Sequence, residues 1–146
     1  MEITIAVFSD FQCPYCARFA AMMKEVPPAE ADKVRLVFHE FPLPMHPWAR
    51  PAAEAAACAQ EQSNSYFWAL HDFMFDQQKD LNRDNLLGKL ADVTKGLTGF
   101  DQGKFAISAA SPTWSTWCPR TKTSWPTCSS RPCTGTVRLP FATRAA

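Results

Sequence analysis

The sequence predicts an α/β fold, and three observations support this class. Residues 2–8 and 34–38 are apolar runs rich in β-branched and aromatic side chains, as in buried strands. The first run leads into a Cys-Pro-Tyr-Cys motif at 13–16, where a strand-to-helix junction is expected. Helical spacing of apolar residues then dominates from about residue 47 to residue 110.

A first helix is expected between the two strands. Its pattern covers residues 15–26 and ends at Pro27-Pro28, because proline does not continue a helix. The apolar side of this helix is expected to consist of residues that share helical spacing, namely Phe19, Met22, Met23 and Val26.

Several helices are expected after the second strand. Residues 49–62 are alanine-rich. Residues 65–77 carry a stripe of Phe, Trp, Leu and Met, which is expected to form core, with part of it a candidate lining for a substrate groove. Asn82 could cap a further helix that ends at Gly96, and residues 100–109 leave room for one or two more turns.

Length, composition and charge describe one globular domain. The chain has 146 residues, of which 47% are hydrophobic and 20% charged, enough apolar material for a single core. The formal net charge of +1 gives no basis for nucleic-acid binding, and no apolar run reaches the roughly 20 residues of a membrane span. No signal peptide precedes the first expected strand, so we expect either a cytoplasmic chain or one that lacks its natural N-terminus.

The composition changes near Ser111, which divides the chain into a domain at 1–111 and an atypical tail at 112–146. The tail has none of the 14 acidic residues, but it has three of the five tryptophans and three of the six cysteines. Only residues 136–139 resemble a strand there. Two interpretations are open. The tail is a disordered Ser/Thr/Pro-rich segment, or it is frameshifted, since another reading frame over 114–133 permits a charged amphipathic helix.

The cysteine motif suits thiol–disulfide chemistry. Unpaired N–H groups and the dipole at a helix start favour an anion, and such placement lowers the pKa of a cysteine thiol. Cys13 is therefore the candidate attacking thiolate. Cys16, one turn later, is close enough to resolve a mixed disulfide, and Pro14 fits the first helical turn because its missing N–H needs no partner there. Half of a zinc site or a structural disulfide remains an alternative, although no second pair with zinc-ligand spacing follows.

Other candidate residues have simpler interpretations. His39, His46 and His71 lack metal-ligand spacing, and we expect His71 on a packed helix face and His46 in a turn. Glu40 ends the second strand and could accept a proton near the sulfurs, but a solvated strand end is the simpler interpretation. Cys58 is expected to be a small buried hydrophobe. The other cysteines are treated as incidental and are Cys118, Cys128 and Cys133.

Several segments resemble the DsbA-like thiol–disulfide oxidoreductases. They occur in that family's order and are FSDFQCPYC at 8–16, FPLP at 41–44 with His46, the alanine-rich stretch from Ala49-Arg50, and FWALHD at 67–72. The resemblance covers about residues 3–110 and implies a thioredoxin-like fold with an inserted helical subdomain at about 47–110. Beyond it the family's C-terminal strands are missing or replaced, and neither Pro112 nor Pro126 can be assigned as its cis-proline.

The resemblance also implies a function. It implies disulfide exchange with protein thiols and disulfides, a redox partner protein, no organic cofactor, no metal, and a periplasmic or otherwise exported location. Cys13 and Cys16 would be catalytic, Pro14 and Tyr15 would tune the motif, and no substrate-binding residue can be named. The leading hypothesis is a DsbA-like oxidoreductase whose turnover is impaired by its C-terminal half. The alternatives are a redox-motif fragment without turnover and a small zinc-binding module.

Overall fold

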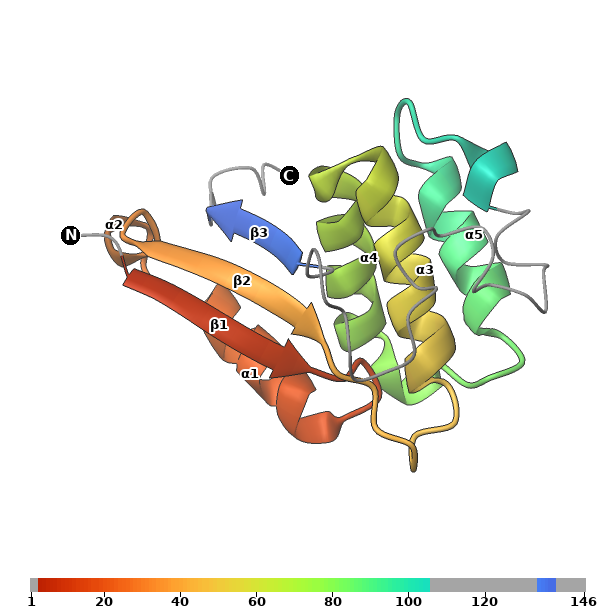
Figure 1. Ribbon diagram of the computed structural model, residues 1–146, viewed down its shortest axis with the longest axis horizontal. Helices are drawn as coiled ribbons and strands as arrows, with labels where there is room; N and C mark the ends of the chain where they lie inside the picture. Colours follow the sequence, from red (N-terminus) through yellow and green to blue (C-terminus); the bar gives the residue numbers. More distant parts are fainter. Residues whose placement is uncertain (1–2, 106–133, 139–146) are drawn as a thin grey trace, which may run out of the picture.

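The structure is a computed structural model that describes residues 3–105 and 134–138 (Figure 1). In chain order the elements are β1 (Ile3–Ser9), α1 (Pro14–Lys24), α2 (Pro28–Ala31), β2 (Val34–Glu40), α3 (Ala49–Gln62), α4 (Asn64–Asp76), the 3-10 turn η1 (Gln78–Asp80), α5 (Leu86–Lys95) and β3 (Thr134–Arg138). Residues 102–105 add one helical turn. The sheet occupies one side of the molecule, and α3, α4 and α5 pack together on the other (Figure 1).

The two expected strands are present and pair in parallel. β1 and β2 align from Ile3 opposite Val34 to Ser9 opposite Glu40. Parallel strands need a crossover connection, and α1 followed by α2 supplies it. The pairing confirms the α/β class and places the end of β1, where the cysteine motif begins, beside the end of β2.

A third strand lies in the atypical tail. β3 pairs with β2 in the antiparallel sense, so the order is β1-β2-β3 and β1 lies at an edge of the described sheet. Disorder was one of the two predictions for 112–146, with a strand at most at 136–139. It is wrong for residues 134–138, where threonine and valine favour extended pairing. Predictions for the rest of the tail, Pro112 and Pro126 included, lie outside the described residues.

Small residues of α1, rather than large ones, pack against the core. Ala20 is buried, and Cys16 and Ala17 contact the core cluster. Met22 was predicted on the apolar side, but it is 64% exposed, so that prediction is wrong. The helix turns a narrow face of small side chains inward, and Lys24 at its end forms a 2.7 Å ion pair with Asp76 of α4.

The expected helical region is present. α3 matches the predicted 49–62, and α4 begins and ends within one residue of its prediction. Ser63 separates the two helices and caps α4, because its side chain accepts a hydrogen bond from the N–H of Ser65. Asn82 was predicted to cap the last helix, but the N-cap of α5 is Asn85, and Asn82 accepts hydrogen bonds from two backbone N–H groups in the turn before it. The helix ends at Gly96 as predicted. The single turns α2 and η1 were not predicted, because each is too short for an apolar repeat.

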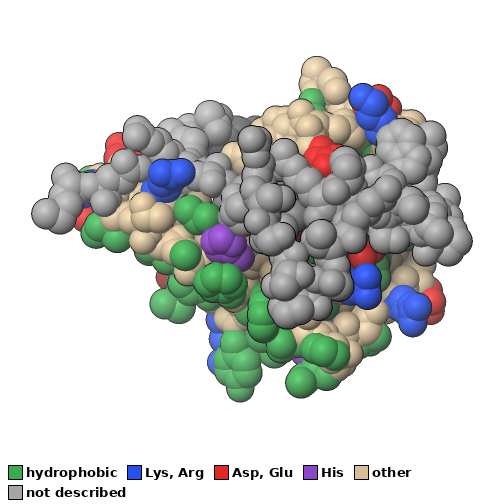
Figure 2. All heavy atoms as spheres, viewed as in Figure 1, with side chains coloured by type: hydrophobic (Ala, Val, Ile, Leu, Met, Phe, Trp, Pro, Cys, Tyr) green, Lys and Arg blue, Asp and Glu red, His purple; other side chains and the backbone are tan. Residues whose placement is uncertain are grey.

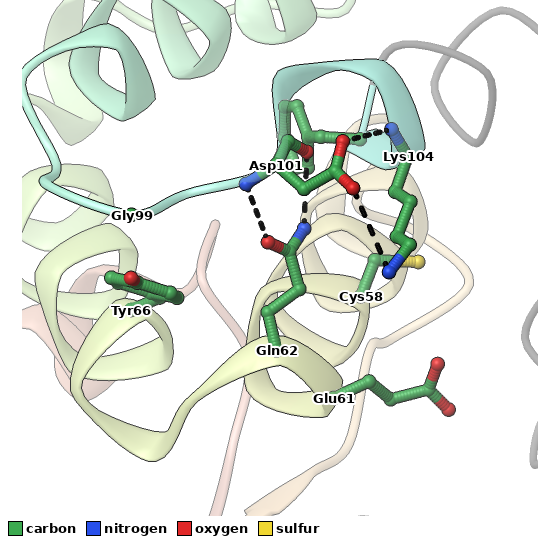
Figure 3. Close-up of a pocket in the computed structure, with 8 residues that line it drawn as sticks. Cys58, Glu61, Gln62, Tyr66, Gly99, Asp101 and Lys104 are labelled. Carbon is green, nitrogen blue, oxygen red and sulfur yellow. Dashed lines mark hydrogen bonds and ion pairs between the residues drawn. The ribbon is translucent and has the colours of Figure 1, made fainter.

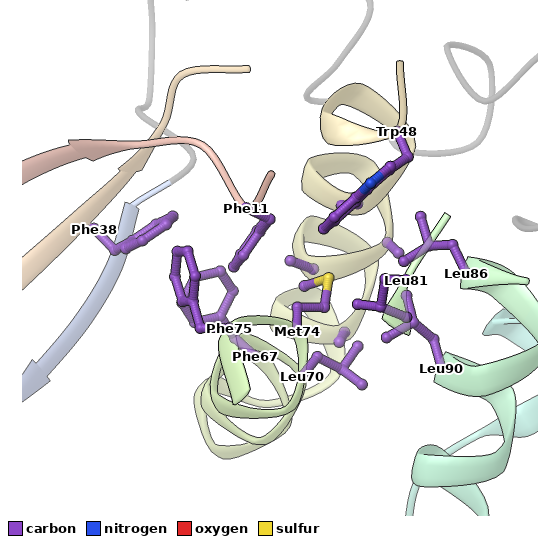
Figure 4. Close-up of a cluster of buried hydrophobic side chains, with 14 of the residues drawn as sticks. Phe11, Phe38, Trp48, Phe67, Leu70, Met74, Phe75, Leu81, Leu86 and Leu90 are labelled. Carbon is purple, nitrogen blue, oxygen red and sulfur yellow. The ribbon is translucent and has the colours of Figure 1, made fainter. Parts of the chain in front are cut away.

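The hydrophobic core lies mainly among α3, α4 and α5 and reaches the sheet at Phe38 (Figure 4). The stripe of α4 supplies buried Phe, Leu and Met side chains, which confirms its prediction as core. Phe11, in the loop after β1, is fully buried against Phe38 and Phe75, with ring centroids 5.4 and 5.2 Å away (Figure 4). The segment just before the cysteine motif is therefore anchored in the core.

The sheet side leaves large apolar side chains in contact with solvent. Figure 2 shows hydrophobic side chains gathered over the lower left of this face, where Figure 1 places β1 and α1. Among the residues that the structure describes, the exposed large hydrophobic ones are Ile3, Phe8, Tyr15, Met22, Phe41 and Met45. Within the described ranges, no helix is both long and apolar enough to cross a lipid bilayer.

Candidate active site

The cysteine motif lies at the junction of β1 and α1, as predicted. Cys13 is the N-cap residue of α1, with extended backbone at φ −74° and ψ 123°, and Pro14 is the first helical residue. The positive end of the helix dipole lies at Cys13, and no side chain caps this helix end. Cys13 and Cys16 are free thiols, and both are partly buried.

The Cys16 sulfur has a distinct environment. Burial, the largest effect, raises the pKa of the Cys16 thiol, and contact with Cys13 raises it further. Hydrogen bonds with the Asp10 backbone and the Ser9 side chain act in the opposite direction without reversing the shift. A thiol with a raised pKa stays protonated at neutral pH and is a poor first nucleophile. Of the two sulfurs, Cys13 is therefore the candidate for the first attack, and Cys16 is its partner one turn later in the motif.

Pro14 and Tyr15 lie on the outer surface of the motif. Both are exposed, and Tyr15 is 74% exposed. The guanidinium of Arg18 lies 5.6 Å from the centroid of the Tyr15 ring, within cation–π range. Tyr15 therefore presents an aromatic surface beside the cysteines, and its role in tuning them stays a prediction.

Asp10 organises the loop that carries Cys13. Its buried carboxylate accepts hydrogen bonds from the N–H groups of Gln12 and Leu43, each 2.7 Å long. His46 Nδ1 lies 2.7 Å from the same carboxylate. The Asp10 carbonyl accepts a 3.1 Å hydrogen bond from the N–H of Cys13. One buried side chain thus joins the motif loop to the loop between β2 and α3.

Two glutamine side chains connect the motif loop to the helical region. Gln12 Oε1 accepts a 2.9 Å hydrogen bond from the N–H of Trp48, at the start of α3. The second glutamine, Gln78, lies on η1 and binds the backbone of the motif loop. Its Nε2 donates to the carbonyl oxygens of Phe11, at 2.7 Å, and Cys13, at 3.0 Å. The motif loop is therefore held from both ends of the α3–α4 pair.

Glu40 is a buried acid at the same end of the sheet. Both of its carboxylate oxygens are buried, and neither has a hydrogen-bond partner among the described residues. Burial raises the pKa of Glu40 well above its ordinary value, and the nearby charge of Asp10 raises it further. The prediction of a solvated strand end is therefore wrong. Pairing with β1 continues up to Glu40, opposite Ser9, and the carboxyl group is kept out of water.

The other two histidines are held by aromatic contacts. His71 is buried, with its ring 5.1 Å from that of Phe38, which confirms the packed helix face. Burial lowers the pKa of His71, although a 3.1 Å hydrogen bond with Asp72 opposes this effect. His39 stacks on Phe8 with centroids 4.7 Å apart. These contacts are structural, and neither ring is among the groups that hold the motif loop.

A hollow of about 650 Å³ lies away from the cysteine motif, where α3 and α4 meet the segment before residue 105 (Figure 3). Cys58 lines it and is only partly buried, so the prediction of Cys58 as a small buried hydrophobe is wrong. Gln62 exchanges two hydrogen bonds with the backbone of Asp101, at 2.8 and 3.3 Å (Figure 3). These bonds join the end of α3 to the segment around Asp101, which is typical of a structural contact.

The zinc alternative gains no support from the described part of the chain. There, no group of three or more His, Cys, Asp or Glu side chains is placed to hold a metal ion. The remaining cysteines lie outside the described residues and are Cys118, Cys128 and Cys133.

Sequence reasoning did not single out Asp10, Gln12 or Gln78. Asp10 carries a local signal, because an Asp side chain that accepts from the N–H two residues later is a common turn feature. The prediction of His46 in a turn is confirmed, because its N–H donates a 3.0 Å hydrogen bond to the carbonyl of Leu43, but its contact with Asp10 gives no local pattern. Gln78 is 65 residues from Cys13, and only the folded chain brings them together.

Comparison with known proteins gives the class to which this fold and motif belong. A family model described as "Thioredoxin" matches residues 2–124. The match covers most of the chain, including the cysteine motif, the two parallel strands and the helical region. The chain therefore belongs to the thioredoxin family.

Individual relatives are longer proteins. The chain is 37% identical to the Na(+)/H(+) antiporter NhaA 3 of Salinispora tropica over 86 residues. These aligned residues make up 58% of this chain and 13% of the antiporter. It is 32% identical to the Na(+)/H(+) antiporter NhaA of Herminiimonas arsenicoxydans over 111 residues. These aligned residues make up 76% of this chain and 16% of that antiporter. The chain thus spans only a small part of these curated relatives. No solved structure gives a significant match.

Proposed function

We propose that this chain is a DsbA-like thiol–disulfide oxidoreductase that exchanges disulfides with protein substrates. The observation that carries the proposal is the position of the cysteine pair. Cys13 lies at a helix start that no side chain caps, and Cys16 lies in the first turn with a raised pKa. Membership of the thioredoxin family and the resemblance of residues 8–16 to the DsbA-like motif support the same chemistry.

In the oxidising direction, a substrate thiolate attacks the Cys13 sulfur of a Cys13–Cys16 disulfide. That bond breaks, a mixed disulfide forms on Cys13, and Cys16 leaves as a thiolate that takes up a proton. A second substrate thiolate then attacks the substrate sulfur of the mixed disulfide and releases Cys13. Two electrons and two protons pass from the substrate to the cysteine pair, and the reverse sequence reduces a substrate disulfide.

The local hydrogen bonds favour this division of roles. The helix start stabilises negative charge on Cys13 when it leaves. The Ser9 side chain and the Asp10 backbone lie in hydrogen-bond contact with Cys16 and can stabilise the thiolate that the first step expels. The raised pKa of Cys16 favours reprotonation of that thiolate, which slows its return attack on the mixed disulfide while the second substrate thiolate attacks.

A protein substrate fits the surroundings of the motif. Phe41 and Met45 lie in the loop that Asp10 joins to the motif loop, and together with Tyr15 they are exposed apolar side chains. Such side chains offer contacts to apolar residues of an unfolded chain. A periplasmic or otherwise exported location and a redox partner protein belong to this proposal through the DsbA resemblance.

A second arrangement is favoured by the names of the relatives. Because the chain matches a small part of two Na(+)/H(+) antiporters, we propose that this thioredoxin-family domain can also act beside such a transporter. The same cysteine chemistry would then act on cysteines of the transporter or its neighbours. A disulfide-trapped complex containing the antiporter would support this arrangement.

Trapping tests the proposal directly. The reduced protein is alkylated near pH 6 and mapped by mass spectrometry, and Cys13 is expected to react before Cys16 and Cys58. Cys16→Ser is expected to accumulate mixed disulfides on Cys13 with a reduced, unfolded protein in the presence of oxidised glutathione. Cys58→Ser is the matched control and should turn over like the unaltered chain. Preferential labelling of Cys16, or no mixed disulfide in the Cys16→Ser variant, contradicts the proposal.

A further inference from the structure

The side-chain amide of Gln78 lies where it can act on the cysteine motif from a distant part of the sequence. Its nitrogen donates to the carbonyl oxygens of both Phe11 and Cys13. The orientation of the amide is settled by chemistry, because both partners are acceptors and only the NH₂ group can donate to them. Gln78 is partly buried, so water competes poorly for these bonds.

We propose that Gln78 is a positioning residue for Cys13, through which the helical region sets the reactivity of the attacking sulfur. This inference rests on the proposed thiol–disulfide function. The two carbonyl groups bracket the segment from residue 11 to residue 13, so one side chain holds its direction. One of the two acceptors is the backbone carbonyl of Cys13 itself, so the amide places partial positive charge on the residue that carries the sulfur.

The rest of the motif's environment does not replace this contact. The Cys13 carbonyl accepts a helical hydrogen bond from Ala17, at 3.2 Å, but among the described residues Gln78 is the one side chain that donates to both carbonyls. Asp10 and Gln12 hold the loop through other groups, namely the N–H groups of Cys13 and Trp48. Removing the Gln78 amide therefore leaves the loop attached but removes the side-chain donor from the carbonyl groups of Phe11 and Cys13.

Two substitutions of opposite electrostatic effect test the role. Gln78→Met keeps the length of the side chain and removes both donors. We expect it to slow alkylation of Cys13 by iodoacetamide at pH 6 by about threefold to tenfold, because the hydrogen bonds that hold Cys13 in its place are lost. Gln78→Lys keeps donors and adds positive charge, and we expect alkylation at least as fast as in the unaltered chain. In glutathione buffers, Gln78→Met should shift the equilibrium toward the Cys13–Cys16 disulfide by a similar factor.

Gln77 provides matched controls, since it is the neighbouring residue, is exposed, and ends α4 through its backbone. Gln77→Met and Gln77→Lys should react and equilibrate like the unaltered chain. A role limited to folding would move Gln78→Met and Gln78→Lys in the same direction, and that result overturns the proposal. Equal behaviour of Gln78→Met and Gln77→Met also overturns it. If Gln78→Met does not melt cooperatively, Gln78→Lys is compared with Gln77→Lys: alkylation of Cys13 that is at least as fast in Gln78→Lys supports the proposal, and slower alkylation overturns it.

The same measurements separate this inference from the proposed function. If the unaltered chain does not exchange with glutathione, the oxidoreductase proposal fails, whatever Gln78 does. If the unaltered chain exchanges and its Cys13 reactivity is insensitive to both Gln78 substitutions, the oxidoreductase proposal stands and the positioning role fails.

Discussion

The helical half of the molecule and its sheet differ in how completely they cover their apolar residues. In α4 and α5, Met74 and Leu90 have no exposed surface. In β1, Ile3 and Phe8 are 54% and 66% exposed, and β1 is an edge strand of the described sheet. The loop that carries Cys13 nevertheless starts from this poorly covered strand.

The hydrogen bonds of that loop explain how an ordered site can follow an exposed strand. Asp10 binds the N–H of Leu43, Gln12 binds that of Trp48, and Gln78 binds two carbonyls of the loop. Phe11 adds apolar anchoring by its burial in the core. β1 leads directly into the motif, and hydrogen bonds and packing from the helical half fix the position of the motif loop.

The largest expected effect is a difference in the free energy of unfolding when Met is replaced by Ala in each of the two regions. Met74→Ala in α4 removes a fully buried side chain and is expected to lower the free energy of unfolding by about 2–5 kcal/mol, because it leaves a cavity. Met22→Ala in α1, where the side chain is exposed, should change it by less than about 0.5 kcal/mol. Urea unfolding measures both. Similar losses in the two variants would show that the two regions are equally packed.

The next effect concerns the connection between the regions. Asp10→Ala leaves the N–H groups of Gln12 and Leu43 without their acceptor and is expected to cost about 1–3 kcal/mol. Asp84→Ala, in an exposed turn, is the control and should cost little. Hydrogen exchange should show faster exchange at Gln12 and Leu43 in the Asp10 variant. Unchanged protection at these two amides would mean that Asp10 does not hold the loop.

A third effect depends on pH and on the buried acid at the end of β2. Because the pKa of Glu40 is raised in the folded state, the folded chain retains a proton that the unfolded chain loses. Stability should therefore fall as pH rises from the unfolded pKa toward the folded one, by up to about 1.4 kcal/mol per pH unit. Glu40→Gln cannot ionise and should be the more stable form above neutral pH, with the difference vanishing below about pH 4.

Thermal melts between pH 4 and pH 8 measure this difference. His71 has a lowered pKa and destabilises the fold only as pH falls below its unfolded value, in both proteins alike. It therefore cancels when the two are compared at the same pH. A constant difference between Glu40→Gln and the unaltered chain over this range would show that Glu40 does not change its charge on unfolding.

Local patterns predicted more of this molecule than long-range contacts did. The two strands and the cysteine motif at a helix start follow from β-branched runs and from the position of Cys13 and Cys16 after the first run, whereas the parallel pairing comes from the structure. The inward face of α1 was missed because Ala20 is small, and hydrophobic size misleads where helices pack closely. The burial of Glu40 and the contacts of Gln78 depend on residues that are distant in the sequence, which no local window contains.

The smallest expected effect on stability lies on the exposed face of β1. Phe8 contributes a stacking contact with His39 but little burial, so Phe8→Ser should lower the free energy of unfolding by no more than about 1 kcal/mol. Its effect on association should be larger, because an edge strand with exposed apolar side chains favours contact between chains. Sedimentation at increasing concentration should show less self-association than in the unaltered chain, with Thr4→Ser on the same strand as the control. Equal self-association in all three proteins would mean that the sheet side, although less covered than the helical half, is not the surface through which chains meet.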